Sequence, residues 1–381
     1  MANQIIRFGV IGCGLMGKEF ASAAARWCHL TDVDFEPRIV AVCDANPSAA
    51  EWFQQHVPSV ERTYSEYKEL LADPSVEAIY CAVPHNLHAQ IYVDIIRAGK
   101  HLLGEKPFGI DQDANAVIQQ AIDKMPQVIV RCSSEFPFFP GAQQIVQWVN
   151  ENRFGKIIEV EAGFWHSSDL DSTKPINWKR RIATKIHGRS WHACAPFASA
   201  FRQETKKCPF ALTKIVNECP DGRGGTAPCE TWDNAVLACE VETADQKFPM
   251  LLSTKRIAPG HANTWFIRIQ GTDFSAEFST KYPKQIASLP YELGRPQAWH
   301  VWDVPNKSAY GTITGGIFEF GFSDSILQMW AAFCDEIVNR SGIRQFFHCA
   351  TPEEAAGSHL VFTAALASER TGETVTIDWG I

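Results

Sequence analysis

Gly12-Cys-Gly-Leu-Met-Gly17 is the stretch that decides the fold, because it places a GxGxxG pattern between the strand-like run Ile6–Ile11 and a helical pattern. In this pattern the first glycine allows a tight turn, the second lets backbone N–H groups approach a pyrophosphate, and the third lets the helix pack closely on the strand. The phosphates then meet the N-terminus of the helix, which attracts anions. We expect the turn to bind a dinucleotide through Gly12, Gly14, Leu15, Met16 and Gly17. The alternative is a glycine-rich turn without a ligand, since a lone GxGxxG is a weak signal.

An acidic residue ends the second strand-like run. Asp44 follows Ile39–Cys43, at the position where an acid accepts hydrogen bonds from the adenosine ribose hydroxyls. The number of residues between Gly17 and Asp44 is somewhat large for this pattern, and we interpret Thr31–Pro37 as a loop insertion that accounts for the extra residues. A 2′-phosphate would meet the negative charge of Asp44, and no arginine follows to neutralise it, so NAD is favoured over NADP. The alternative is that Asp44 only caps the next helix.

The order of patterns along the chain predicts two domains. Short apolar runs alternate with helical patterns over the first ~130 residues, which is typical of a parallel sheet wound with helices. Beyond that, alternating strand-like runs dominate, and helical patterns return only near residues 325–340 and 352–370. We predict an α/β Rossmann domain over residues 1–134 and, over 135–381, an α+β domain on a mostly antiparallel sheet. Further strands are expected at Arg38–Cys43, Ala78–Val83, Lys100–Leu103, Gln127–Cys132, Gly155–Trp165, Asn234–Glu242, Met250–Ser253, Trp265–Gln270 and Ala276–Phe278.

Composition excludes several classes of function. The 381 residues are 45% hydrophobic and 20% charged, with a formal net charge of −8 and no basic stripe to follow a phosphate backbone, so we expect no nucleic-acid partner. Apolar stretches such as Ile5–Ile11 are far shorter than the roughly 18 residues that span a bilayer, so we expect no membrane partner. The chain enters a strand without a signal-peptide pattern, and we expect a cytoplasmic protein. The 12 cysteines form no CxxC pair and are interpreted as reduced and mostly buried. Nothing in the spacing of His, Asp or Glu predicts a metal site.

Two later segments resemble those of the Gfo/Idh/MocA oxidoreductases, the family of glucose–fructose oxidoreductase and inositol 2-dehydrogenase. Val83-Pro-His-Asn-Leu-His88 resembles the family segment that lines the nicotinamide ribose, and Gly104-Glu-Lys-Pro107 resembles the EKP signature. The resemblance adds to the cofactor site Val83, Pro84, His85, His88, Glu105 and Lys106. Shorter matches are Trp178-Lys-Arg, Trp232-Asp-Asn-Ala, Gly271-Thr-Asp, the helix around Trp330–Ile337 and Thr351-Pro-Glu-Glu.

The family implies an architecture and an activity. Its Rossmann domain is followed by a domain with a large open sheet, of which one face covers the nicotinamide and the other often mediates oligomerisation. We therefore expect residues 135–381 to bind substrate and to form a homodimer or homotetramer. Typical family substrates are sugars, sugar derivatives and cyclitols, oxidised at a secondary hydroxyl. The resemblance thus predicts an NAD-dependent dehydrogenase with a small polyol or sugar as its substrate.

Lys106 is the catalytic residue that the resemblance implies. In the family the EKP lysine touches the hydroxyl that loses its proton while hydride leaves the same carbon, and a lysine there stabilises developing alkoxide charge. The resemblance also predicts a cis Lys106–Pro107 bond, although few X–Pro bonds are cis in folded proteins. The alternative is a solvated surface lysine before a turn proline.

The rest of the usual catalytic set is missing from the sequence. Family members commonly have a glycine-rich turn and a helix with an aspartate and, four residues on, a histidine. Matching the glycine to Gly188 puts His192 at the aspartate position and Pro196 at the histidine position. We predict a rearranged set of Lys106 with His192 or His187, because histidine titrates near neutrality. A structural role is the alternative for His192.

A second departure is Glu135, which stands where the family often has an arginine. These departures leave two other functions open: a catalytically silent NAD-binding regulator, and redox-assisted elimination or hydrolysis in which the cofactor is recycled. Trp165, His166 and Trp178 lie where family members place substrate contacts. Packing in the core is the alternative for such aromatic side chains.

Overall fold

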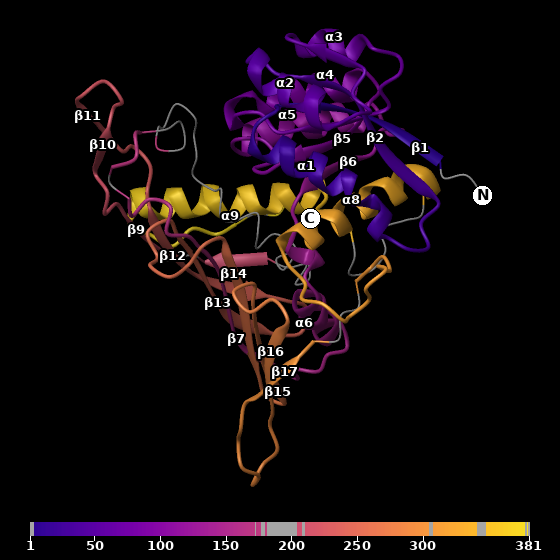
Figure 1. Ribbon diagram of the computed structural model, residues 1–381. Coiled ribbons are helices and arrows are strands. Elements are labelled where there is room, and N and C mark those ends of the chain that lie inside the picture. Colours follow the sequence, from indigo (N-terminus) through magenta and orange to yellow (C-terminus); the bar gives the residue numbers. More distant parts are fainter. Residues whose placement is uncertain are drawn as a thin grey trace. The chain divides into compact units, whose positions relative to one another are not determined.

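The computed structural model describes residues 4–171, 173–176, 180, 204–207, 210–304, 308–340, 348–377 and 379. The chain divides into two compact units (Figure 1). The first unit comprises Met1–Phe139 and Pro305–Pro352, and the second comprises Pro140–Val304 and Glu353–Ile381. The sequence division into 1–134 and 135–381 stays a proposal about functional domains.

The first unit is built on a parallel sheet, which confirms the α/β prediction. Among the described residues six strands pair in the order β3-β2-β1-β4-β5-β6, all in parallel. The strands are β1 (Gln4–Ile11), β2 (Phe35–Cys43), β3 (Arg62–Tyr64), β4 (Ala78–Cys81), β5 (His101–Glu105) and β6 (Val130–Ser133). In this order the sequence of strands reverses between β1 and β4, and dinucleotides bind at such a reversal, beyond the carboxyl ends of the strands.

The first unit also contains helices, most of which connect these strands. They are α1 (Leu15–Ala25), α2 (Pro47–His56), α3 (Tyr67–Ala72), α4 (His88–Arg97), α5 (Gln112–Asp123) and α8 (Phe322–Asn339), with short 3-10 turns at η1 (Trp27–His29), η2 (His85–Leu87) and η3 (Phe136–Phe138). Asp111 caps α5, because its side chain accepts a hydrogen bond of 2.9 Å from the Ala114 N–H. Gly99 follows α4 at a φ of 73°, the left-handed conformation that glycine adopts after a helix.

A helix from far along the chain completes the core of the first unit. Trp330 of α8 stacks on Phe8 of β1 with ring centroids 5.3 Å apart, and Phe20 of α1 stacks on Tyr80 of β4 at 3.9 Å. All four side chains are almost fully buried. Burying a large apolar side chain stabilises a fold by about 1.5–3 kcal/mol. The packing of α8 therefore explains why Pro305–Pro352 belongs to the first unit.

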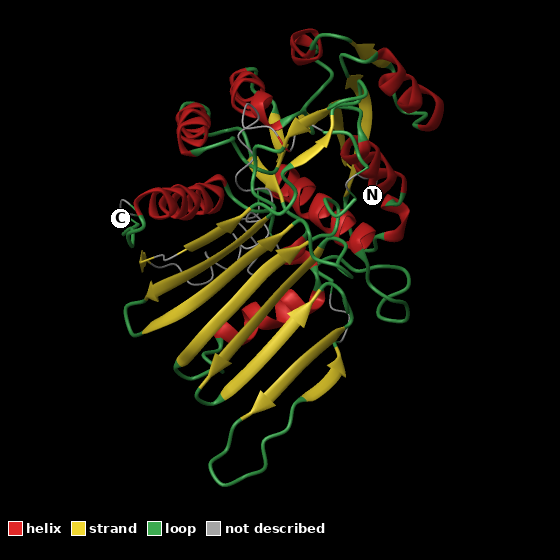
Figure 2. Cartoon of the chain, turned by 90° about the vertical axis from the view of Figure 1, so that its left-hand side faces the viewer, coloured by secondary structure: helices red, strands yellow, loops and turns green. Residues whose placement is uncertain are grey.

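The second unit is built on a large, mostly antiparallel sheet, as predicted (Figure 2). Eight described strands pair in the order β17-β16-β15-β14-β7-β13-β12-β8, with β9 also beside β12, and the β7–β13 pair is parallel. The elements are α6 (Pro140–Asn150), β7 (Ile157–Trp165), β8 (Glu204–Lys207), β9 (Phe210–Thr213), β10 (Glu218–Pro220), β11 (Thr226–Pro228), β12 (Asn234–Glu242), β13 (Lys247–Lys255), β14 (Thr264–Gly271), β15 (Phe274–Ser279), β16 (Gln285–Pro290), β17 (His300–Asp303) and α9 (Pro352–Thr371).

The two faces of this sheet differ in polarity. On one face α6 lies against β15 so closely that a Cβ atom on Gly141 would be 2.1 Å from the Phe278 ring. On the other face, Arg268 of β14 bonds to Glu161 of β7 at 3.1 Å and to Glu277 of β15 at 2.9 Å, and these side chains are partly exposed. One face thus carries part of the core of the unit, and the other presents charged groups.

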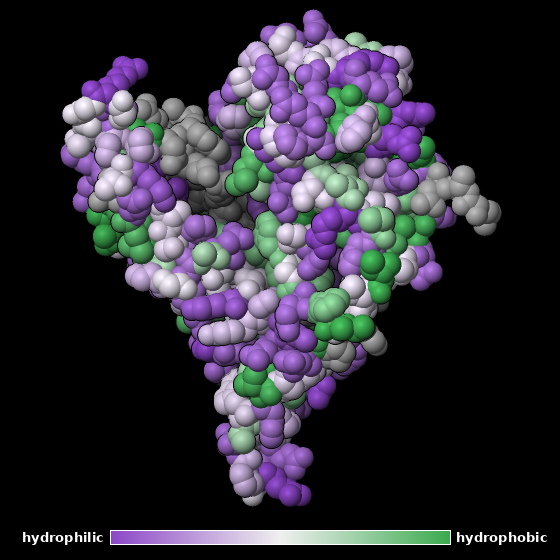
Figure 3. Space-filling model, in the orientation of Figure 1, coloured by the Kyte–Doolittle hydropathy of each residue, from purple (hydrophilic) through white to green (hydrophobic). Residues whose placement is uncertain are grey.

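The surface in view is mainly polar. Figure 3 shows hydrophilic side chains over most of this face, with apolar ones scattered among them. Among the described helices, none is both long and apolar enough to cross a membrane.

Candidate dinucleotide and catalytic site

The glycine turn after β1 leaves no room for side chains at two positions and open space at the third. Gly12 has a φ of 97°, and a Cβ there would lie 2.5 Å from the Ala82 carbonyl oxygen. A Cβ on Gly17 would lie 2.3 Å from the Gly12 carbonyl oxygen. Around Gly14, by contrast, no atom lies within 4 Å of the Cβ position, and α1 begins at the next residue with no acidic side chain in its first turn. This cradle fits a pyrophosphate that approaches backbone N–H groups at a helix N-terminus.

Asp44 fixes the turn rather than the next helix. Its Oδ2 accepts a hydrogen bond of 2.8 Å from the Cys13 N–H, and its Oδ1 accepts one of 2.8 Å from the Asn46 N–H. The side chain that caps α2 belongs to Asn46, which accepts from the Ser48 N–H at 3.2 Å. Capping of α2 by Asp44 is therefore wrong as an interpretation. The half-buried carboxylate keeps lone pairs that could bind ribose hydroxyls.

Other residues of the turn differ in their exposure. Leu15 is 82% exposed at the first position of α1, and Met16 is half-buried. Cys13 is fully buried, and this burial, with the charge of Asp44 second, raises the pKa of its thiol to about 12. Cys13 therefore stays a neutral thiol at physiological pH.

The segment after β4 is tied to the EKP turn by a buried histidine. His88 lies at the start of α4 with Nδ1 2.7 Å from the Pro107 carbonyl oxygen and Nε2 3.0 Å from the Val83 carbonyl oxygen. Its ring also stacks on Tyr92 at 4.8 Å. His88 thus links the two loops that the sequence assigns to the nicotinamide side. Direct contact of the cofactor with His88, buried His85, half-buried Val83 or exposed Pro84 stays a prediction.

Two tyrosines hold the EKP turn in place. Glu105 is 7% exposed, and its Oε1 accepts a hydrogen bond of 2.7 Å from the Tyr80 hydroxyl. The Tyr92 hydroxyl donates to the Glu105 carbonyl oxygen at 2.7 Å. Gly104 lies against the same ring, since a Cβ there would be 2.7 Å from Tyr92. The backbone before Lys106 is therefore fixed from both sides.

Lys106 is not a solvated surface residue. Its side chain is 16% exposed, and Nζ lies 2.7 Å and 2.6 Å from the two carboxylate oxygens of Glu135, whose side chain is 2% exposed. The ring of Phe136 lies 5.2 Å from the same nitrogen. The Lys106–Pro107 bond is cis, as predicted. The structure thus brings together Lys106 and Glu135, the residue noted in the sequence only as a departure from the family.

Two of the predicted substrate contacts lie at the end of β7 in the second unit. Trp165 is half-buried, donates from Nε1 to the Ser253 hydroxyl at 2.8 Å and lies under the Lys255 ammonium at 4.4 Å. His166 is half-buried and accepts at Nδ1 from the Ser168 N–H at 2.9 Å. Both side chains are positioned by their own neighbours, and their contact with substrate stays a prediction.

The remaining predicted residues, His192, His187 and Trp178, lie outside the described residues, as does Pro196. Within the part of the chain that the structure describes, no group of three or more His, Cys, Asp or Glu side chains could hold a metal ion.

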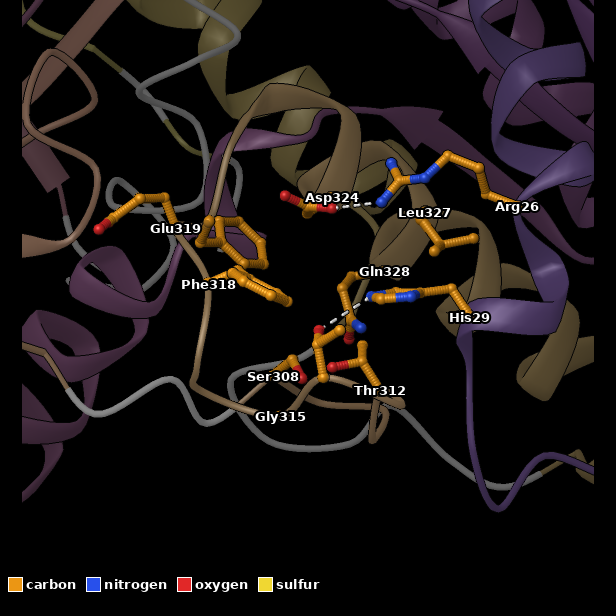
Figure 4. A pocket seen from close by; sticks show the side chains of 12 residues that line it. Arg26, His29, Ser308, Thr312, Gly315, Phe318, Glu319, Asp324, Leu327 and Gln328 are labelled. Atoms are coloured by element: carbon orange, nitrogen blue, oxygen red, sulfur yellow. Dashed lines mark hydrogen bonds and ion pairs between the residues drawn. The ribbon is translucent and has the colours of Figure 1, made fainter.

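A separate pocket of about 230 Å³ lies in the first unit (Figure 4). It is lined by Arg26, just after α1, by His29 and by residues of α8 and the segment before it. Arg26 points toward Asp324 and forms an ion pair with it at 2.6 Å, so the two charges neutralise each other. The glycine turn is at the other end of α1, about 16 Å away for 11 residues. The pocket is therefore distinct from the dinucleotide cradle.

The fold and the site together define a protein with a Rossmann unit built for a dinucleotide and a second unit on an open sheet. Residues 6–132 match a family described as an oxidoreductase family with an NAD-binding Rossmann fold. The Rossmann part of the chain thus matches the Gfo/Idh/MocA oxidoreductases, the family that the sequence motifs resemble.

Similar proteins include two dehydrogenases, one named for levoglucosan and one for inositol. Levoglucosan dehydrogenase of Pseudarthrobacter phenanthrenivorans is 24% identical over 177 residues, 46% of this chain and 45% of that protein. The inositol 2-dehydrogenase/D-chiro-inositol 3-dehydrogenase of Lactiplantibacillus plantarum is 23% identical over 187 residues, 48% of this chain and 50% of that protein. The matches thus span about half the length of these relatives. A structure of levoglucosan dehydrogenase with NADH and levoglucosan has the same fold, with a TM-score of 0.87 at 18% identity over 98% of this chain and 100% of that one.

Proposed function

We propose that this chain is an NAD-dependent dehydrogenase that moves hydride between a secondary hydroxyl of a sugar, sugar derivative or cyclitol and nicotinamide. The observation that carries the proposal is the half-buried Lys106 ammonium just beyond the carboxyl end of β5, in the sheet whose β1 turn forms the dinucleotide cradle. The names of the relatives support the substrate class, since they act on levoglucosan and inositol.

The residues that would hold the cofactor fit a dinucleotide. Gly12, Gly14 and Gly17 leave a cradle for the pyrophosphate, and Asp44 presents a half-buried carboxylate beside it. When bound, the nicotinamide supplies a hydride acceptor. We propose that NAD is preferred to NADP, because a 2′-phosphate would be repelled by the Asp44 carboxylate.

Lys106 would act on the substrate hydroxyl. Its ammonium can donate a hydrogen bond to the hydroxyl oxygen and stabilise the negative charge that develops there as the proton leaves. Because the site is partly desolvated, this interaction is stronger than it would be in water. We propose His192 or His187 as a further acid or base, and Trp165, His166 and Trp178 as substrate contacts. A cytoplasmic location and a homodimer or homotetramer also stay predictions.

The test is a screen of sugars and cyclitols with NAD and NADP, in which nicotinamide absorbance reports turnover. On the substrate found, Lys106→Ala should lower kcat by about 10²-fold or more and leave NAD affinity nearly unchanged, since the lost interaction acts at the transition state. Lys124→Ala, at an exposed lysine after α5, is the matched control and should keep wild-type kcat. Full turnover in Lys106→Ala would refute the proposal. The screen also separates it from a silent regulator and from redox-assisted elimination, which we do not favour.

A further inference from the structure

The Lys106–Glu135 pair is fixed by the register of two neighbouring strands. β5 and β6 are parallel, and Glu105 at the end of β5 pairs with Ser133 at the end of β6. Carboxyl ends of parallel strands lie at the same edge of a sheet, so the residues just beyond them meet there. Lys106 is one residue beyond its strand and Glu135 is two beyond its own. The pairing of β5 with β6 therefore positions Lys106 and Glu135 for this contact.

Holding this largely desolvated pair away from water costs free energy of folding. Removing two charges from water costs several kcal/mol per ion, which good geometry only partly offsets. Both carboxylate oxygens of Glu135 contact the same nitrogen, so the carboxylate is directed at Lys106. The neighbouring ionisable groups have other bonds: Glu105 accepts from Tyr80, and His88 contacts two backbone carbonyls. Among these neighbouring groups, Glu135 is thus the carboxylate that contacts Lys106.

Lys106 as an ammonium ion cannot accept a proton, yet oxidation of an alcohol releases one. An ammonium can take part in such a transfer only if it gives up one of its own protons as it gains the new one. Glu135 is placed to receive that proton, because its oxygens lie 2.6 Å and 2.7 Å from Nζ. Transfer between groups at this separation is within hydrogen-bond reach.

We propose that Glu135 is a positioning residue that holds Lys106 and takes up, through it, the proton of the substrate hydroxyl; this role rests on the proposed function. The hydroxyl O–H bond breaks and an N–H bond forms at Nζ, while another N–H bond of Nζ breaks and an O–H bond forms on Glu135. The electron pair of the O–H bond becomes the second bond of the carbonyl as hydride leaves the same carbon. Lys106 ends with its charge unchanged, and Glu135 ends as a neutral carboxyl group.

The first test compares two buried carboxylates of the first unit. Glu135→Gln should lower kcat by about 10²-fold, the low end of the effect of proton transfer by a positioned side chain, with KM within a few-fold of wild type. Glu336→Gln is the matched control, since Glu336 pairs with Arg131 at 2.6 Å and is 9% exposed, but has no contact with Lys106 among those described. It should keep kcat. Formate added to Glu135→Ala should restore part of the lost kcat by replacing the carboxylate.

The second test needs no turnover. In cofactor-free protein, the rate of acylation of Lys106 at pH 8, followed by mass spectrometry, reports how accessible Nζ is to a reagent. Both carboxylate oxygens of Glu135 hydrogen-bond to Nζ and hold it, so Glu135→Gln should be acylated at Lys106 about tenfold faster than wild type or Glu336→Gln.

The outcomes distinguish this inference from the proposed function. If wild type turns over no polyol, the proposed function fails and this role fails with it. If wild type is active but Glu135→Gln keeps its kcat, only this inference is overturned. It is also overturned if both glutamine variants lose kcat in step with thermal stability and formate restores nothing, since that pattern means a structural role. Equal acylation of Lys106 in all three proteins would refute the hold of Glu135 on Nζ itself.

Discussion

Gly14→Ala should separate dinucleotide binding from folding. Gly14 has a φ of −75° and a ψ of −158°, which alanine adopts without strain, and the Cβ position has no atom within 4 Å. Because alanine also restricts the unfolded chain, the free energy of unfolding should rise slightly or stay within about 1 kcal/mol of wild type. The methyl group would instead occupy the space through which a pyrophosphate approaches the backbone. Loss of one hydrogen bond to a charged group costs about 1.5–3 kcal/mol, so the Kd for NAD should rise about tenfold to hundredfold.

Gly17→Ala is the matched comparison in the same turn. Its Cβ would lie 2.3 Å from the Gly12 carbonyl oxygen, whereas ordinary contacts begin at 3.4 Å, so backbone atoms must move by about 1 Å. Such overpacking costs about 1–3 kcal/mol, and this variant should unfold at lower denaturant concentration. Urea unfolding and calorimetric titration with NAD measure the two effects. Wild-type NAD affinity in a stable Gly14→Ala protein would refute the assignment of this turn to the pyrophosphate.

Three further measurements follow from named groups. Asp44→Asn keeps an acceptor for the Cys13 N–H but removes the charge, so the ratio of the NADP to the NAD Kd should fall by about tenfold, and an unchanged ratio would contradict the proposed preference. Burial of His101, and second the charge of Arg340, lower the pKa of His101 from 6.5 to about 4, so between these pH values the unfolded state binds a proton that the folded state does not. The free energy of unfolding should therefore fall by up to about 3 kcal/mol as the pH falls from 6.5 to 4, and a His101→Gln variant should lack this pH dependence. Exposed Cys28 should be alkylated at least 10²-fold faster than Cys13 at pH 8, as peptide mass spectrometry can check.

The fold of the first unit was predictable because its signals are local. A strand, a glycine turn and a helix follow one another between Gln4 and Ala25, and the strand and the helix each carry their own periodicity. The start of β2 was predicted wrongly, because Phe35-Glu-Pro37 contains a proline and was assigned to a loop, whereas it pairs with β1. The helix α6 was missed because Pro140-Gly141 reads as a break. Proline is favourable at a first helical position, and Gly141 is needed for close packing on Phe278.

The contact between Lys106 and Glu135 could not be predicted in the same way. It depends on the register of β5 with β6, which pairs residues 28 positions apart and has no local signal. One clue was present in the sequence: Glu135 precedes Phe136-Pro-Phe-Phe139, and a lone charge beside an apolar run has to find a buried partner. Parallel strands that end at one edge restrict that partner to residues just beyond the neighbouring strands.

The carboxyl-end edge of the parallel sheet suggests that the residues that carry out the reaction differ from those that select the substrate. The polar side chains at this edge already have hydrogen-bond partners. Asp44 accepts from two backbone amides, Glu105 accepts from Tyr80, His88 contacts two backbone carbonyls, and Lys106 contacts Glu135. Strong discrimination between polyols needs hydrogen-bonding groups that are left unsatisfied by the wrong substrate. Groups that already satisfy each other do not provide it. We therefore expect substitutions that change substrate preference to lie outside this edge, and substitutions within it to change turnover on all substrates alike.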